Sequence, residues 1–159
     1  MRIFWWSNAP WTHTGYGNQT RLFVPRVQAL GHEVILGANY GLDGAVLNID
    51  EGVSIYPRGL DSHGSDVLAP HSERAKADIT ITLYDSWAFD PGATARIRWC
   101  PWMPVDHDAL PIEIGARIQT AWQPIAYSRH GEASLRDAGF DPLYVPHGID
   151  TKRFFPDDR

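Results

Sequence analysis

The segment Thr14-Gly15-Tyr16-Gly17-Asn18-Gln19-Thr20 joins a short apolar run to an amphipathic stretch, with two glycines close to the start of a predicted helix. Glycine lets the backbone approach a ligand closely because no Cβ stands in the way. The first turn of a helix adds unpaired N–H groups and a partial positive charge, which favour a phosphate or diphosphate. Gly15, Tyr16 and Gly17 are therefore candidates for contact with such a group. The alternative interpretation is a tight turn that needs glycine for its backbone dihedrals.

The triplet Asp106-His107-Asp108 is the second candidate for chemistry. A carboxylate on either side of His107 would orient the imidazole ring, which suits it to hold a hydroxyl group. The alternatives are a solvated loop and one arm of a metal site. We expect no metal, because no second His/Asp cluster has convincing ligand spacing. Cys100 is the only cysteine, so a metal cluster built from cysteines is excluded within this chain.

Further candidates lie in loops or near the ends of predicted strands. Asp85 follows an apolar strand and is expected to line a cleft at the carboxyl edge of the sheet. Tryptophan faces in these places can stack on sugars or bases, although packing in the core is the alternative for each of them. The cleft candidates are Trp11, His13, Asp85, Trp87, Trp102 and Asp106.

Two nucleotide-binding classes fit the glycine segment poorly. Thr20 stands where the third glycine of the dinucleotide fingerprint belongs, and the second predicted strand ends Leu36-Gly37-Ala38-Asn39 without an acidic residue for a ribose. A nicotinamide-dependent oxidoreductase is therefore a minor alternative. The phosphate-loop pattern Gly-Lys-Ser/Thr does not occur in the sequence.

Composition limits the partners. The chain has 159 residues, 43% hydrophobic and 21% charged, as expected for one folded globular domain. Its formal net charge of −5 makes nucleic acid an unlikely partner, because phosphate-backbone binding normally requires a basic surplus. No stretch approaches the ~18 apolar residues of a membrane span, and a cytoplasmic location is the expectation.

Short apolar runs alternate with amphipathic stretches, the pattern of an α/β domain. We therefore predict a Rossmann-like, doubly wound parallel sheet in a single domain over residues 1–148, with a linker over 149–159. The expected strands cover residues 2–6, 33–38, 53–56, 79–83, 98–105, 124–127 and 143–145. The expected helices cover residues 18–30, 66–76, 112–122 and 132–138.

Several fragments together resemble the family 4 glycosyltransferases, which are retaining enzymes with the two-domain GT-B fold. Their order and spacing carry the resemblance, which spans nearly the whole chain. The matching fragments are Gly15-Tyr16-Gly17, Leu30-Gly31-His32-Glu33-Val34, Pro104-Val105-Asp106-His107-Asp108, Ala126-Tyr127-Ser128-Arg129 and Val145-Pro146-His147-Gly148-Ile149-Asp150 with the Phe154, Phe155 and Pro156 that follow.

The resemblance implies roles for individual residues. Gly15, Tyr16 and Gly17 would lie against the donor diphosphate and the transferred sugar, and His107 would contact that sugar as the catalytic candidate. The cleft tryptophans would belong to the acceptor pocket. Such an enzyme uses a nucleotide sugar as substrate with no further cofactor, and its donor-binding C-terminal domain is absent from this chain. The chain would then be the N-terminal half of the GT-B fold. The alternative is a stand-alone module that binds a saccharide or nucleotide without catalysis.

Overall fold

The computed structural model describes residues 1–49 and 53–156, and within them eight strands form one sheet in the order β3-β4-β2-β1-β5-β6-β7-β8. Every neighbouring pair is parallel except β3 and β4, which run antiparallel. The strands are β1 (Arg2–Asn8), β2 (Glu33–Tyr40), β3 (Leu47–Ile49), β4 (Val53–Pro57), β5 (Ile79–Leu83), β6 (Trp99–Met103), β7 (Ile125–Ala126) and β8 (Leu143–Tyr144).

Strand β1 shows why the sheet has a hydrophobic core on each face. Successive side chains of a strand point to opposite faces. Ile3 and Trp5 belong to one buried cluster, and Phe4 and Trp6 belong to the other. The near-continuous apolar run of β1 therefore reflects a central parallel strand that is buried on both sides.

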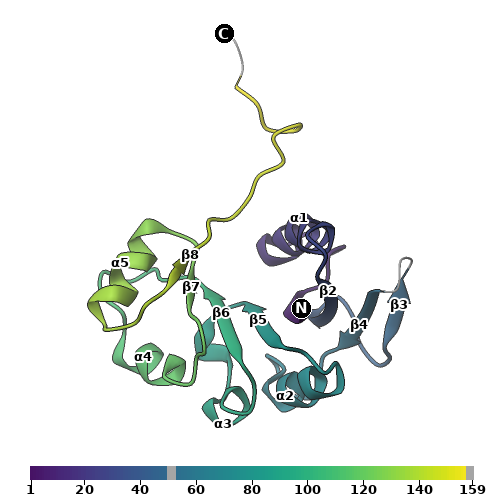
Figure 1. The fold of residues 1–159 in the computed structure, drawn as a ribbon, viewed down its shortest axis with the longest axis horizontal. Coiled ribbons are helices and arrows are strands. Elements are labelled where there is room, and N and C mark those ends of the chain that lie inside the picture. The colour runs from purple at the N-terminus through teal and green to yellow at the C-terminus, as the bar shows by residue number, and fades with distance from the viewer. Residues whose placement is uncertain (50–52, 157–159) are drawn as a thin grey trace.

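Helices cover both faces of the sheet (Figure 1). Helix α1 (Gly15–Ala29) packs on the face that carries Trp5, through Val24. The other face is covered by α2 (Ser65–Arg74), α4 (Ile112–Ile118) and α5 (Arg129–Asp137), which contribute Leu68, Ile118 and Leu135 to the second cluster. A 3-10 turn (Ser86–Ala88) and α3 (Pro91–Thr94) complete the connection between β5 and β6. The predicted doubly wound α/β fold is confirmed.

Strand order reverses at β1, which lies between β2 and β5. In sheets of this type, ligands bind beyond the carboxyl ends of the strands at such a switch point. At this edge β1 ends at Asn8, and Tyr84 directly follows β5. The segments after these two residues carry most of the predicted site residues.

Several predicted boundaries were wrong by a few residues. Helix α1 begins at Gly15 instead of residue 18, since the Thr14 hydroxyl accepts the N–H of Gly17. Helix α5 begins at Arg129 instead of residue 132, since Ser128 caps it in the same way. Helix α4 ends at Ile118, before the predicted residue 122, and β3 and α3 were not predicted.

The chain leaves the domain after Gly148, and the segment beyond it extends away from the sheet (Figure 1). The side chain of Gln19 in α1 fixes Gly148 through two hydrogen bonds. Its amide donates to the Gly148 carbonyl at 3.0 Å, and its oxygen accepts the Gly148 N–H at 2.8 Å. Ile149, Phe154 and Phe155 are exposed in this tail. Among the helices of the described residues, none combines the length and the apolar character needed to cross a bilayer.

Candidate functional site

The two glycines at the start of α1 serve different purposes. Neither has a positive φ, so the turn does not need glycine for its dihedrals. A Cβ on Gly17 would collide with the Thr12 side chain and lie 2.7 Å from the Thr12 carbonyl oxygen, so Gly17 is required for packing. A Cβ on Gly15 would meet nothing within 4 Å. Gly15 is therefore the open position, where a ligand can approach the helix start.

Tyr16 connects the helix start to the loop after β5. Its hydroxyl donates to Asp85 Oδ2 at 2.9 Å, and its ring lies 5.3 Å from that of Tyr84. Burial raises the pKa of the Tyr16 phenol, and the Asp85 carboxylate raises it further. Tyr16 therefore remains a neutral hydrogen-bond donor that fixes one oxygen of Asp85.

A small cavity brings four predicted residues together. Its volume is about 100 Å³, and its polar lining includes Asp85, Trp87, Asp106 and His107. The His107 ring donates through Nδ1 to Asp106 Oδ1 at 2.9 Å, which fixes the ring orientation as the sequence suggested. The His107 carbonyl accepts a bond from His130 Nε2 at 2.7 Å, so the first turn of α5 holds this loop. The remaining lining residues are Ser86, Pro104, Val105, Leu110, Pro111 and Ile114.

Tyr127, at the end of β7, lies in the same electrostatic environment. Burial, and then the carboxylates of Asp85 and Asp106, raise the pKa of its phenol to about 12. The ring of His147 lies 4.1 Å from that of Tyr127, and burial lowers the pKa of the imidazole. A neutral His147 therefore packs at the point where the chain leaves the domain.

The remaining predicted residues do not all share the cleft. Trp11 and His13 are exposed in the loop after β1, where the indole N–H of Trp11 donates to the Gly41 carbonyl at 2.9 Å. The prediction that Trp102 stacks in the cleft was wrong. Trp102 is only 2% exposed, its N–H donates to the Val145 carbonyl, and its ring packs edge-on against Phe23. Its large apolar area belongs to the core beneath α1.

Sequence reasoning missed several polar residues at the ends of strands. Asn39 is the extra residue of a bulge between β1 and β2, and its amide donates to the Tyr84 hydroxyl at 3.0 Å. Asn8 donates to Thr14 Oγ1 at 2.9 Å. The side-chain oxygens of both asparagines are buried without a partner in the described part of the chain. Both asparagines lie just after the ends of predicted strands, and this position could have identified them as site candidates from the sequence.

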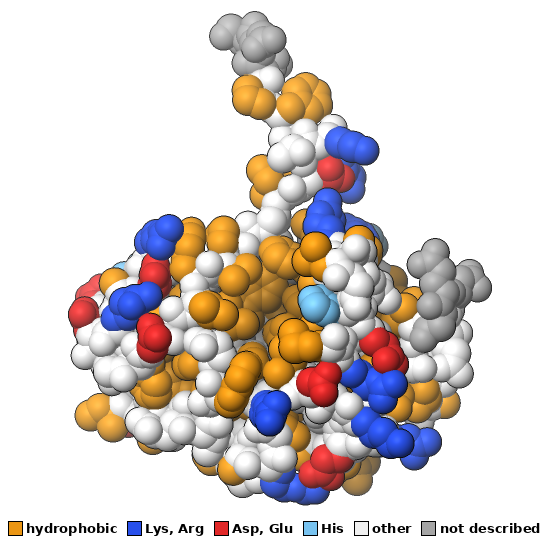
Figure 2. All heavy atoms as spheres, in the orientation of Figure 1, with side chains coloured by type: hydrophobic (Ala, Val, Ile, Leu, Met, Phe, Trp, Pro, Cys, Tyr) orange, Lys and Arg blue, Asp and Glu red, His pale blue; other side chains and the backbone are white. Residues whose placement is uncertain are grey.

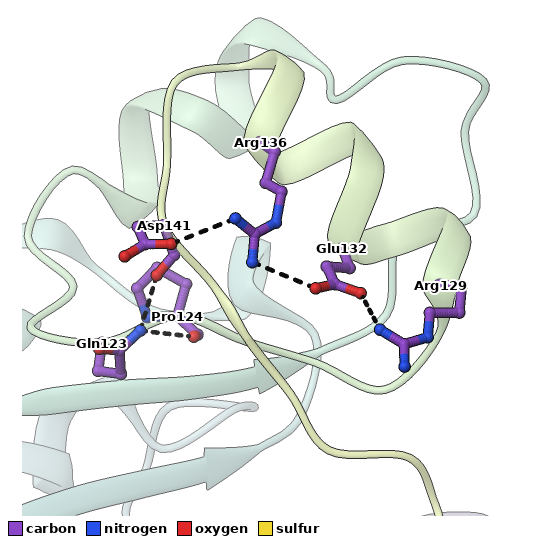
Figure 3. A network of polar contacts seen from close by, with 6 residues as sticks. All are labelled: Gln123, Pro124, Arg129, Glu132, Arg136 and Asp141. Atoms are coloured by element: carbon purple, nitrogen blue, oxygen red, sulfur yellow. Dashed lines mark hydrogen bonds and ion pairs between the residues drawn. The ribbon is translucent and has the colours of Figure 1, made fainter.

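The arginine at the start of α5 is already engaged (Figure 3). Glu132 accepts from Arg129 at 2.6 Å and from Arg136 at 3.2 Å, and Arg136 also reaches Asp141 at 3.5 Å. The Arg129 guanidinium lies 3.7 Å from the centre of the Tyr144 ring. These contacts hold the Arg129 side chain against α5 and β8, so its guanidinium is already paired within the domain.

Apolar side chains gather in a hollow beside α1 on the face shown in Figure 2. Partly buried residues of the core under α1 include Ile79, Ile81, Tyr127 and Val145.

In residues 1–49 and 53–156, no group of three or more His, Cys, Asp or Glu side chains is arranged to hold a metal ion.

Comparison with known proteins gives a match in structure alone. No family model matches the sequence, and no curated protein matches it. Among solved structures, sucrose-phosphate synthase from Thermosynechococcus elongatus superimposes with a TM-score of 0.71 at 14% sequence identity. The match covers 99% of this chain and 50% of that chain. The domain is thus similar in fold, over its whole length, to half of a sucrose-phosphate synthase.

Proposed function

We propose that the chain is the N-terminal, acceptor-side half of a retaining GT-B glycosyltransferase of family 4. It would act on a nucleotide-sugar donor and a saccharide or other acceptor. The observation that carries the proposal is that the glycine segment and the Asp106–His107 pair converge on Asp85, at the carboxyl edge of the sheet. The fold shared with half of a sucrose-phosphate synthase supports the same assignment.

The start of α1 is suited to the donor diphosphate. The Thr14 side chain and carbonyl accept the N–H groups of Gly17 and Asn18, so those of Gly15 and Tyr16 are left to face a ligand. Negative charge grows on the leaving diphosphate as the sugar departs. Free amides at the positive end of a helix stabilise such charge without rearranging.

The Asp106–His107 pair is suited to the transferred sugar. The imidazole is 62% exposed while Asp106 fixes its orientation, so its other ring nitrogen is available to a sugar hydroxyl. Trp87, half exposed at the rim of the cavity, would present a ring face to the acceptor. Trp11 and His13 would contact more distant parts of the acceptor.

The proposal assigns residues 1–148 to this half and residues 149–159 to the connection toward a donor-binding half. The 50% coverage of the similar solved structure supports that division. Transfer would then need both halves, and the nucleotide would be held mainly by the second.

The test compares Gly15→Val with Ala29→Val in this chain joined to the coding sequence that follows it in its gene. A Cβ at Gly15 enters open space, so the variant should fold, while its side chain blocks approach to the helix start. Ala29 is exposed at the other end of the same helix and serves as the control. We expect Gly15→Val to abolish sugar transfer and Ala29→Val to retain it. Full activity of folded Gly15→Val would show that the loop assignment is wrong.

Calorimetric titration of the chain alone with UDP-glucose, GDP-mannose and UDP distinguishes the alternative function. Tight binding by the chain alone would favour a self-sufficient saccharide- or nucleotide-binding module. Binding and transfer only in the extended protein would support half of an enzyme.

A further inference from the structure

The cavity beside Asp85 is small and has a distinct polar part. We call it the Asp85 cavity and define its polar part as Asp85, Ser86, Trp87, Asp106 and His107. Its volume is about 100 Å³, several times what one water molecule needs. It can therefore hold one substituent of a ligand, while the rest of the ligand lies outside against Trp87.

The charges around this cavity have one sign. Asp85 and Asp106 contribute two carboxylates, and no lysine or arginine is present among the lining residues. Arg117, one turn along α4 from the lining residue Ile114, donates to the Phe89 carbonyl at 2.8 Å. A phosphate or carboxylate in the cavity would meet two negative groups, and the only cation that the lining could supply is a protonated His107, whose ring already pairs with Asp106.

Two polar groups in the cavity still lack partners. Ser86 is 2% exposed and lines the cavity, and its hydroxyl forms no hydrogen bond within the residues that the structure describes. The Ser86 hydroxyl oxygen remains accessible, so a water molecule or a ligand group can bond to it. Asp85 uses Oδ2 for the Tyr16 hydroxyl, which leaves Oδ1 free to accept.

Trp87 adds a recognition element for positive charge. Its indole is 50% exposed beside the carboxylates, and His63 packs against it edge-on with ring centres 5.0 Å apart. The face of an indole attracts ammonium groups. Burial, and then the Asp85 carboxylate, raise the pKa values of the Tyr16 and Tyr127 phenols, so both stay neutral beside the cavity.

We infer that the Asp85 cavity binds an ammonium substituent, so that the preferred acceptor of the proposed transferase is an amine-bearing polyhydroxyl compound rather than a phosphorylated one. The carboxylates of Asp85 and Asp106 would accept the ammonium protons, Ser86 would bond to a neighbouring hydroxyl, and Trp87 would cover the carbon skeleton. Only the role of the bound compound as an acceptor rests on the proposed function. The binding preference itself is a property of this domain.

The test titrates the ¹⁵N-labelled chain with glucosamine, glucose and glucose 6-phosphate at low salt and neutral pH, and follows amide shifts. We expect glucosamine to bind about fivefold more tightly than glucose, a factor typical of one exposed ion pair with a cation–π contact. Glucose 6-phosphate should bind more weakly than glucose. The amides that shift should include those of Asp85, Trp87 and His107.

Asp85→Asn is the matching variant, because asparagine keeps an oxygen for the Tyr16 hydroxyl while the charge is lost. The preference for glucosamine should then fall to about twofold or less, and Asp106→Asn, in an exposed loop, should lower it as well. Asp137→Asn, at the far end of α5, makes the same change in net charge and should leave the preference intact.

Equal affinity for glucosamine and glucose, an unchanged preference in Asp85→Asn, or no binding at tens of millimolar would each overturn the inference. These readings need no nucleotide sugar and no transfer. An amine preference without transfer in the extended protein would leave the inference standing and overturn the proposed function. Transfer to neutral or phosphorylated acceptors without an amine preference would support the proposed function and overturn the inference.

Discussion

Alanine substitutions at Gly15 and Gly17 test whether the two glycines have different purposes. At Gly15 the added methyl group enters open space. At Gly17 it would meet the Thr12 side chain and two backbone oxygens, those of Thr12 and Ala9, at 2.7 and 2.9 Å. The turn that carries both oxygens is closed by a hydrogen bond from the Thr12 N–H to the Ala9 carbonyl, so it cannot simply move aside.

The expected magnitude follows from two contributions. Overpacking a well-filled site costs about 1–3 kcal/mol in the free energy of unfolding. Alanine also gains up to about 1 kcal/mol over glycine from helix propensity, but this gain applies to both variants and largely cancels in their comparison. Gly17→Ala should therefore be about 2 kcal/mol less stable than Gly15→Ala. For a domain of this size, the melting temperatures should differ by about 4–8 °C.

Urea unfolding followed by tryptophan fluorescence measures the difference directly, with a thermal melt as the second readout. Gly15→Ala should be equal to the wild type or slightly more stable. Equal stability of the two variants would refute the packing explanation for Gly17. Both glycines would then have to be attributed to ligand approach.

Three further perturbations test other contacts. Gln19→Ala should remove the hydrogen-exchange protection of the Gly148 amide with little change in global stability, and retained protection would show that another group holds the tail. Burial raises the pKa of the Cys100 thiol from about 9 to about 11, so the unfolded chain loses this proton first as pH rises. Stability should fall between these values, by up to about 2 kcal/mol more than in Cys100→Val, and parallel pH profiles would contradict this assignment. Arg129→Ala should raise the depressed pKa of the Glu132 carboxyl, measured by NMR titration, because the Arg129 hydrogen bond is its main cause. An unchanged titration would show that this ion pair is not formed in solution.

Much of the fold could be predicted because the sheet is parallel and central. Strand Arg2–Asn8 contains a nearly continuous apolar run, Ile79–Leu83 alternates apolar residues with threonine, and the helices between strands follow the usual period. The glycine segment could be located because it follows the first strand directly. Its two glycines could not be separated from sequence, since that requires knowing that Thr12 lies against Gly17 while space remains at Gly15.

The candidate site could be predicted only in part, because sequence does not specify which way a side chain faces. Trp102 and Trp87 both lie near strand ends, yet one is buried beneath α1 and the other lines the cavity. Strand alternation places Trp102 with Trp5 on the face that α1 covers. Tyr127 is an ordinary residue after a short strand until the topology brings that strand to the same edge of the sheet as Asp85.

Strand β8 affects whether copies of this protein can associate through the edge of the sheet. It is the last strand of the sheet, and its pairing with β7 is short, from Leu143 to the N–H of Val145, between Pro142 and Pro146. An exposed edge can recruit a strand from a neighbouring chain and so begin aggregation. Proline offers no N–H for such pairing, and the two-residue strand has few others. This edge is therefore a poor template for strand addition, even though Leu143 is exposed on it.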